Sequence, residues 1–226
     1  MIDHPLILLG LFPLAAYVIG STPFGVLLAR SKGVDLRAVG SGNIGATNCG
    51  RALGRKWGYF CFALDVSKGL IPVLVVGAIV RPAAGVPELW KQAAWLLVGC
   101  GAIAGHVFSF WLRFGGGKGV ATALGVVLGV WPYFTFAGLI ALGLWIAVTL
   151  WSRYVSLGSL VAATAFLPTF ALLNWGRAAR LWPMGAFAAA MVALIFVRHR
   201  ANIRRLLTGT ENKIGTKKLD AVEAKG

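Results

Sequence analysis

Long apolar runs recur along this chain, and they constrain its fold more than any other feature. Several of them reach about 18 residues or more, the length that crosses the hydrocarbon core of a membrane as a helix. Only 13% of the 226 residues are charged, about half the usual share for a soluble domain, and the mean hydropathy is +0.78. We therefore expect an all-α polytopic membrane protein.

The apolar runs divide into seven predicted transmembrane helices. Residues 120–151 are long for a single tilted span and contain a break at Trp131-Pro132-Tyr133. This region is therefore split into a short element and a longer span that ends near Trp151. The other predicted spans run from about Leu6 to Ala29 with an interruption at Ser21-Thr22-Pro23, from Trp57 to Val80, from Ala93 to Arg113, from the polar patch Ser152–Ser159 to Asn174, and from Leu181 to Val197.

The distribution of positive charge predicts the topology. With the N-terminus outside, seven crossings place the loops 30–56 and 113–119, the patch at 152–159 and the tail on the cytoplasmic side. All but four of the 22 Lys and Arg then lie inside, as the positive-inside rule requires. The four that remain outside are Arg81, Lys91, Arg177 and Arg180.

The chain is expected to form one membrane domain over residues 1–215, followed by a disordered cytoplasmic tail over 216–226. The net charge of +15 does not indicate nucleic-acid binding in a chain of this hydropathy. It fits basic cytoplasmic loops that contact anionic lipid or an anionic substrate.

One glycine-rich loop has the composition of a phosphate site. Its sequence is Gly115-Gly116-Gly117-Lys118-Gly119-Val120-Ala121-Thr122. Consecutive glycines allow backbone amides to converge on an anion, Lys118 adds a charge, and the following apolar run begins a helix whose amides face the same place. A nucleotide P-loop is excluded, because Leu112 and Gly119 stand where that motif needs Gly and Ser or Thr. The alternative is a flexible turn between two helices.

A second glycine-rich loop runs from Gly40 to Asn48 and is followed by Arg51. Its spacing matches the dinucleotide fingerprint G-x-G-x-x-G, but no strand precedes it and membrane spans flank it. We interpret it as a second group of anion-binding amides and short polar side chains, with a glycine-rich turn as the alternative. The candidate ligands are Ser41, Asn43, Thr47, Asn48 and Arg51.

Further candidates lie in the tail and in two of the spans. His199 and Asn202 share one face of a predicted interfacial helix, although a basic tail is usually only a topology anchor. Ser156 lies in the polar patch. His106 is an ionisable residue inside a span, which makes it a functional candidate or a residue bonded to a neighbouring helix. Asp65 and Lys68 are expected to pair across one helical turn.

The residue inventory favours anion binding over other chemistry. Carboxylates are too few for metal-assisted hydrolysis or a two-carboxylate mechanism, and no cofactor site is indicated. No histidine has an Asp five residues later, so the His-x4-Asp dyad of acyl-CoA-dependent acyltransferases is absent. The rival classes are an anion or phosphate channel or transporter and a metal-dependent head-group transferase.

Three segments of the chain resemble the signature motifs of one family. They are Gly40 to Asn48, His106 through Thr122, and Arg198-His199 with Asn202. The resemblance is to the acyl-phosphate:glycerol-3-phosphate acyltransferases (PlsY) of bacterial inner membranes. Two departures are Gly115, where a Lys is common, and Ser109, where a Pro is usual. We expect Arg113 to supply the missing charge.

The resemblance implies transfer of an acyl group from acyl-phosphate to the 1-hydroxyl of glycerol-3-phosphate, with membrane lipids as the surroundings. Lys118, His199, Asn202 and Ser41 would be the catalytic residues. Lys118 with the glycine-loop amides would hold one phosphate, and Arg51 with Ser41, His199 and Asn202 the other. The remaining predicted binding residues are Asn43, Thr47, Asn48, Gly115, Gly116, Gly117, Gly119, Thr122, Ser156 and His106.

Overall fold

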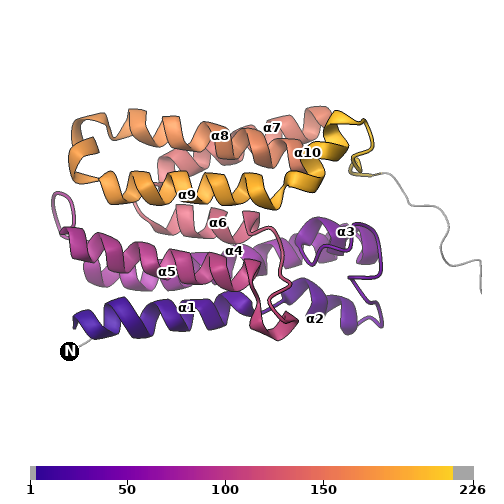
Figure 1. The fold of residues 1–226 in the computed structure, drawn as a ribbon, viewed down its shortest axis with the longest axis horizontal. Coiled ribbons are helices and arrows are strands. Elements are labelled where there is room, and N and C mark those ends of the chain that lie inside the picture. Colours follow the sequence, from indigo (N-terminus) through magenta and orange to yellow (C-terminus); the bar gives the residue numbers. More distant parts are fainter. Residues whose placement is uncertain (1–3, 216–226) are drawn as a thin grey trace, which may run out of the picture.

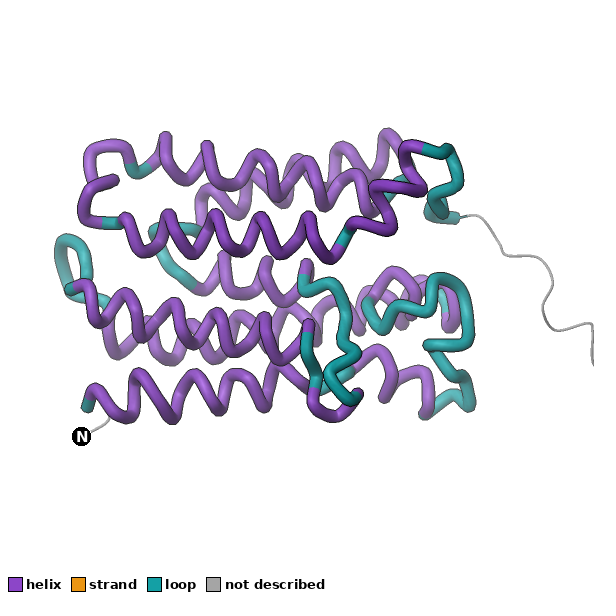
Figure 2. The backbone as a smooth tube through the Cα atoms, viewed as in Figure 1, coloured by secondary structure: helices purple, strands orange, loops and turns teal. Residues whose placement is uncertain are grey.

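The chain folds as a bundle of helices in the computed structural model, which describes residues 4–215 (Figures 1 and 2). No strand occurs in this part of the chain. The tail predicted to be disordered, 216–226, lies outside the described residues. The elements are η1 (Ile7–Leu11), α1 (Phe12–Ser21), α2 (Phe24–Arg30), α3 (Ala46–Leu53), α4 (Arg55–Val80), α5 (Leu89–Val107), η2 (Phe110–Leu112), α6 (Val120–Gly129), α7 (Thr135–Ser152), α8 (Val155–Leu173), η3 (Trp175–Arg180), α9 (Trp182–Arg198) and α10 (Arg200–Leu207).

The predicted spans agree closely with these helices. The lengths of the helices alone do not fix how many of them cross the membrane. Within residues 4–215, five helical segments are long and apolar enough to cross a membrane, and α9 with α10 makes a sixth if this pair, bent by 57°, is one span. The expected short element is α6, whose 10 residues extend only about 15 Å. Since the hydrocarbon core is about 30 Å thick, the count of seven complete crossings stays a prediction.

The first span is interrupted where the sequence predicts. α1 ends at Ser21, Thr22 adopts an extended ψ of 116°, and α2 begins at Phe24 after Pro23. The Thr22 carbonyl that this break frees accepts a hydrogen bond of 2.9 Å from Lys68 Nζ. Lys68 also pairs with Asp65 at 2.8 Å, so the expected ion pair is confirmed and is fully buried.

Glycines allow the spans to approach closely, as is typical of membrane helices. α1 packs along α5, where a Cβ on Gly105 would collide with the backbone of Tyr17, Gly20 and Ser21. α4 packs along α6, where a Cβ on Gly125 would collide with the Val66 backbone. These contacts hold the glycine loop, which joins α5 to α6, between two rigid helix pairs.

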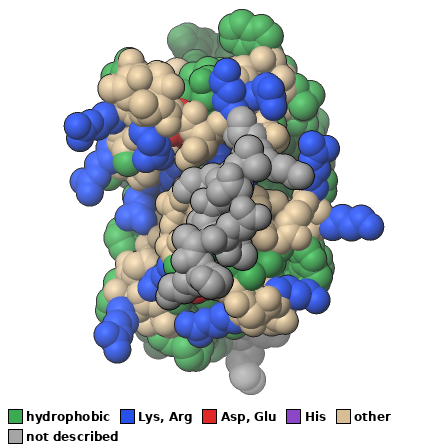
Figure 3. Space-filling view, turned by 90° about the vertical axis from the view of Figure 1, so that its right-hand side faces the viewer, with side chains coloured by type: hydrophobic (Ala, Val, Ile, Leu, Met, Phe, Trp, Pro, Cys, Tyr) green, Lys and Arg blue, Asp and Glu red, His purple; other side chains and the backbone are tan. Residues whose placement is uncertain are grey.

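The two ends of the bundle differ in character (Figure 1). The loops 31–45, 108–119 and 208–215 lie at one end together with α3 and α10, whereas the N-terminus and the loops 81–88 and 174–181 lie at the other. Lys and Arg side chains are distributed around the first end, which Figure 3 faces. The predicted convergence of the polar loops is thus confirmed, and the membrane side on which they lie stays a prediction.

We predict that Thr210 lies on the cytoplasmic side and Ala84 on the outer side. Thr210→Cys should react with a membrane-impermeant maleimide only in inverted vesicles, and Ala84→Cys only in intact cells. Cys49 and Cys61 are buried, so a Cys100→Ala background removes the exposed native thiol. Labelling of both positions from the same side would contradict the predicted topology.

Candidate active site

Segments that are far apart in the sequence meet at the basic end of the bundle. Lys118 Nζ, which precedes α6, donates a hydrogen bond of 2.6 Å to Asn202 Oδ1 on α10. Arg51 on α3 donates to the backbone carbonyl of Asn212 at 3.2 Å. Ser156, in the first turn of α8, donates to the Glu211 carboxylate at 2.9 Å. The structure therefore brings together Lys118, Arg51, Ser156 and Asn202, as the sequence predicts.

Glu211 lies at the centre of this cluster, and the sequence analysis assigns it no role. Its Oε1 atom accepts from Asn202 Nδ2 at 2.7 Å and from Ser156, and its Oε2 atom accepts from Arg205 Nε at 2.7 Å. Partial burial raises the pKa of Glu211, whereas these hydrogen bonds together lower it by more. The net shift of the pKa is therefore downward, and the carboxyl group is ionised. A signal for it in the sequence was an acid placed between the basic residues Arg205 and Lys213.

Lys118 lies among other positive groups and is largely removed from water. Burial is the main cause that lowers its pKa to about 8, and the charges of Arg205, Arg51 and Arg198 act in the same direction. Glu211 opposes this shift. An ammonium in such surroundings gains by binding a further anion, because an anion offsets both the burial and the repulsion.

The glycine loop folds back against the end of α5, and this corrects the predicted arrangement of its amides. The amides of Gly115, Gly116 and Gly117 donate to the carbonyls of Leu112, Val107 and His106, so these three are not free to hold a phosphate. The next five amides, from Lys118 through Thr122, donate to no acceptor within residues 4–215. The anion-binding amides are therefore those at the start of α6, where the helix dipole also favours negative charge.

Two arginines fix the carbonyl side of this loop. Arg198 Nη2 donates to the carbonyls of Gly117 at 2.9 Å and Gly116 at 3.3 Å. Arg37 Nη2 donates to the Gly115 carbonyl at 2.8 Å. The expectation that Arg113 compensates for Gly115 is wrong, since Arg113 is exposed at a left-handed turn (φ 52°) and the guanidinium that reaches Gly115 belongs to Arg37.

The structure also explains Ser109, which stands where the family that the chain resembles usually has a Pro. This side chain is buried, and its hydroxyl donates a hydrogen bond of 2.6 Å to the Ser21 carbonyl at the end of α1. The bond satisfies a backbone acceptor that the break after α1 leaves free. Ser109 therefore fastens the start of the glycine loop to the first span.

In the second glycine-rich loop the predicted ligands separate into two groups. Asn48 is buried, accepts from the Ser41 amide at 2.9 Å and donates to the Leu36 and Val39 carbonyls, so its assignment to phosphate binding is wrong. Asn43 accepts from the Gly45 amide at 2.9 Å, which leaves its NH₂ group free. The exposed Ser41 hydroxyl and the half-buried Thr47 hydroxyl bond to no partner in the described chain.

Thr122 and His106 lie beneath the site. Thr122 is fully buried and its methyl group lies against Gly69 of α4, so it does not face the anion site as predicted. His106 Nδ1 lies 3.6 Å from Asp65 Oδ1, and its ring occupies the space that a Cβ on Gly117 would need. His106 thus supports the loop from below, and the sequence analysis missed Asp65 as its partner.

His199 lies at the bend between α9 and α10 and is almost fully buried. Its Nδ1 atom lies 2.8 Å from the Ile195 carbonyl, which can only accept, so Nδ1 carries a proton. The Nε2 atom of a neutral ring is then an acceptor, and it has no partner within the described residues. Asn202 bonds to Lys118 directly, and the charges of Lys118 and Glu211 act on the His199 ring, so both predicted residues lie near this cluster.

The fold and the site define an integral membrane protein with positive side chains and unpartnered amides gathered at one end of a helical bundle. The sequence profile of the family described as glycerol-3-phosphate acyltransferase matches residues 10–209. The chain belongs to this family, whose members are enzymes.

Individual relatives agree with the family match. The chain is 48% identical over 199 residues to the glycerol-3-phosphate acyltransferase of Geobacter sulfurreducens, covering 88% of this chain and 93% of the relative. It is 44% identical over 203 residues to that of Aquifex aeolicus, covering 88% and 95%. The crystal structure of PlsY, an integral membrane glycerol 3-phosphate acyltransferase, in its glycerol 3-phosphate form has a TM-score of 0.77 at 40% identity and covers 91% and 95%. The lysophosphatidic acid form of PlsY has a TM-score of 0.74 at 39% identity.

We predict that Lys118→Ala lowers the acyltransferase activity of the purified enzyme by about 10²-fold or more, as loss of a preorganised charge typically does. Lys118→Arg should also be poor, because a planar guanidinium does not replace a compact ammonium hydrogen-bonded to Asn202. Near-normal activity in Lys118→Ala would contradict a binding role and would show that the loop is only a turn between two helices.

The pKa of Lys118 also predicts a pH dependence. A lysine is charged below its pKa, so the free enzyme loses this charge as the pH rises through about 8. Since kcat/KM follows the free enzyme, it should decline above about pH 8. Lys118→Arg keeps its charge throughout this range and should lack the decline. An unchanged decline in Lys118→Arg would assign it to another group.

Proposed function

We propose that this enzyme transfers a fatty acyl group from acyl-phosphate to the 1-hydroxyl of glycerol-3-phosphate. The products are lysophosphatidic acid and phosphate, and the reaction is the first step of bacterial phospholipid synthesis. The enzyme would act in the inner membrane with its site toward the cytoplasm. The observation that carries the proposal is a cluster of positive groups around Lys118 beside an apolar groove, whose lining includes Val120, two residues after Lys118.

The apolar groove begins beside the charged cluster. Val120, which follows the glycine loop by sequence, and Ile195, one turn before His199, both line it. Its walls extend between α6, α7, α8 and α9 through side chains such as Leu124, Trp145 and Phe166. An acyl chain in this groove would place its carbonyl carbon near Lys118. A channel for anions would instead need polar groups along its whole length, and the wall of this groove is almost entirely apolar.

Both substrates carry phosphate, and the cluster offers two kinds of anion ligand. On one side are the Lys118 ammonium and the free amides at the start of α6. On the other side are Arg51, with Ser41 and Asn43 on the adjoining loop. These two groups would hold the two phosphates next to each other, so the acceptor hydroxyl and the acyl carbon are brought into contact, which is a large part of the rate enhancement.

The chemical step requires little further assistance, because acyl-phosphate is already an activated mixed anhydride. The acceptor oxygen attacks the acyl carbon, and the bond between this carbon and the phosphate oxygen breaks. The proton of the hydroxyl passes to the departing phosphate. Lys118 and the α6 amides would stabilise the charge that develops on the carbonyl oxygen and on the leaving group.

The donor specificity tests this function. Purified enzyme should make lysophosphatidic acid from glycerol-3-phosphate and acyl-phosphate at least about 10²-fold faster than from acyl-CoA or acyl carrier protein, because the departing phosphate accepts the proton of the hydroxyl and a thioester donor carries no such phosphate at its acyl carbon. Product is measured with radiolabelled glycerol-3-phosphate. Comparable turnover with acyl-CoA would contradict the proposed donor, and no product with any donor would contradict the function.

His199 is proposed to position the acceptor, with the donor phosphate as the base. His199→Gln keeps a polar group of similar reach, so it should retain substantial activity without rescue by added imidazole. A loss of about 10³-fold or more that imidazole restores would show that His199 is the base instead. The measurement is the initial rate across pH with and without imidazole.

A further inference from the structure

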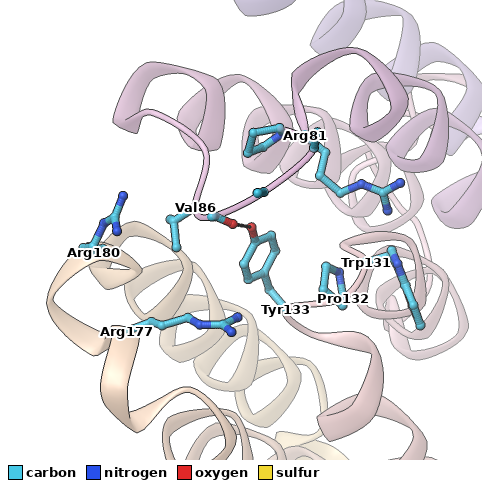
Figure 4. Close-up of a pocket in the computed structure, with 11 residues that line it drawn as sticks. Arg81, Val86, Trp131, Pro132, Tyr133, Arg177 and Arg180 are labelled. Carbon is cyan, nitrogen blue, oxygen red and sulfur yellow. Dashed lines mark hydrogen bonds between the residues drawn. The ribbon is translucent and has the colours of Figure 1, made fainter.

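A second concentration of positive charge lies at the end of the bundle opposite the acyltransferase site. It surrounds an open pocket of about 630 Å³ between the loops 81–86, 131–133 and 177–180. Arg81, Arg177 and Arg180 line this pocket together with Tyr133 and Trp131 (Figure 4). The pocket has no part in the proposed reaction, because the whole length of α6 separates it from Lys118.

The three arginines of this pocket lack neutralising partners. None of their guanidinium groups makes a hydrogen bond or an ion pair within residues 4–215. Glu88, the acid on the neighbouring loop, is already bonded to Lys91 and to Trp90 Nε1. Arginines that line one pocket without a counter-ion favour an anion there, because the anion lowers the electrostatic energy of each guanidinium group.

The walls of the pocket are fixed by hydrogen bonds from buried side chains. Tyr133 Oη donates to the Gly85 carbonyl at 2.8 Å, the dashed bond in Figure 4. Gln92 Nε2 donates to the carbonyls of Pro87 at 2.8 Å and Arg180 at 3.0 Å, which joins the two arginine-bearing loops. Asn174 Nδ2 donates to the Tyr133 carbonyl at 3.3 Å. The backbones that carry the arginines are therefore set in place before any ligand arrives.

Electrostatics link all three arginines to one point in the pocket. Burial raises the pKa of the Tyr133 hydroxyl, and the charges of Arg177, Arg81 and Arg180 act in the opposite direction. All three guanidinium groups are thus within electrostatic reach of the same hydroxyl. Figure 4 shows Arg81 and Arg177 on different sides of the Tyr133 ring, with Arg180 beyond Val86.

Exposed tryptophans place this pocket at the level of lipid headgroups. Trp131, Trp175 and Trp182 are 43%, 80% and 62% exposed, and all three lie at this end of the bundle. Tryptophan is enriched at the boundary between hydrocarbon and water. In the predicted topology these arginines face outward, against the positive-inside bias.

We propose that this pocket binds a phosphate group, either in the headgroup of an anionic phospholipid or in a free phosphate compound. The planar guanidinium groups match the oxygens of a phosphate in pairs, which an ammonium does not. The acyl chains of a bound lipid would lie along the exposed apolar sides of the bundle.

The test uses the full-length protein purified in detergent and a variant with Arg81→Gln, Arg177→Gln and Arg180→Gln combined. Native mass spectrometry measures retention of added phosphatidylglycerol against phosphatidylcholine, and thermal denaturation measures stabilisation by inorganic phosphate. If a lipid headgroup is the ligand, the variant should retain phosphatidylglycerol at least about tenfold more weakly than the wild type. If a free phosphate is the ligand, the variant should instead lose the rise in melting temperature.

Lys91→Gln is the matched control, because Lys91 lies at the same end, is paired with Glu88 and does not line the pocket. Acyltransferase activity, which depends on the opposite end, shows whether each variant is folded. If the triple variant is inactive, the single substitutions should each weaken binding several-fold. Wild-type responses of the arginine variants to both probes, or an equal loss in Lys91→Gln, would overturn the proposal.

Discussion

The structure depends on the requirement that every backbone group buried in the bundle finds a partner. A loop that enters a membrane bundle cannot leave its amides facing hydrocarbon. The amides of Gly116 and Gly117 meet this requirement by folding back on the end of α5, where Val107 and His106 supply the carbonyls, and the amides of residues 113–115 bond to carbonyls of residues 109–112. Arg198 and Arg37 satisfy the opposite side of the same loop. Within residues 4–215 the amides of Lys118 through Thr122 remain free, and the position of the proposed anion site follows from this.

The Glu211 carboxylate lies among positive side chains, in the kind of position that a bound anion would take. The cluster contains Lys118, Arg51 and Arg205, and without a negative group these charges would repel one another inside a poorly hydrated pocket. The carboxylate accepts from Ser156, Asn202 and Arg205 at once, much as a phosphate would. The site thus keeps its donors oriented by means of an anion that belongs to the chain itself, and a substrate phosphate enters an arrangement that is already formed.

The helices could be predicted from the sequence more accurately than the contacts between them. Hydrophobic length is a local signal, so the span predicted from Trp57 to Val80 differs from α4 by only two residues at one end. The convergence of the polar loops followed from the charge distribution. By contrast, Asn48 and Thr122 have the composition of ligands but face inward, and only the packing of distant segments shows this. The same holds for Arg37, which reaches Gly115 across 78 positions of the chain.

The shortness of α6 has a consequence for kinetics. Lys118 lies at the basic end of the bundle, and α6, which begins beside it and extends only about 15 Å, lines the apolar groove, so the proposed site meets water on one side and lipid on the other. In the proposed reaction the acceptor arrives from solution, whereas the donor arrives by lateral diffusion. The rate should therefore depend on the bulk molarity of one substrate and on the mole fraction of the other in the bilayer. Diluting the membrane with inert lipid would slow such an enzyme at constant total donor, whereas diluting the vesicle suspension at a fixed concentration of the dissolved acceptor would leave the turnover per enzyme unchanged.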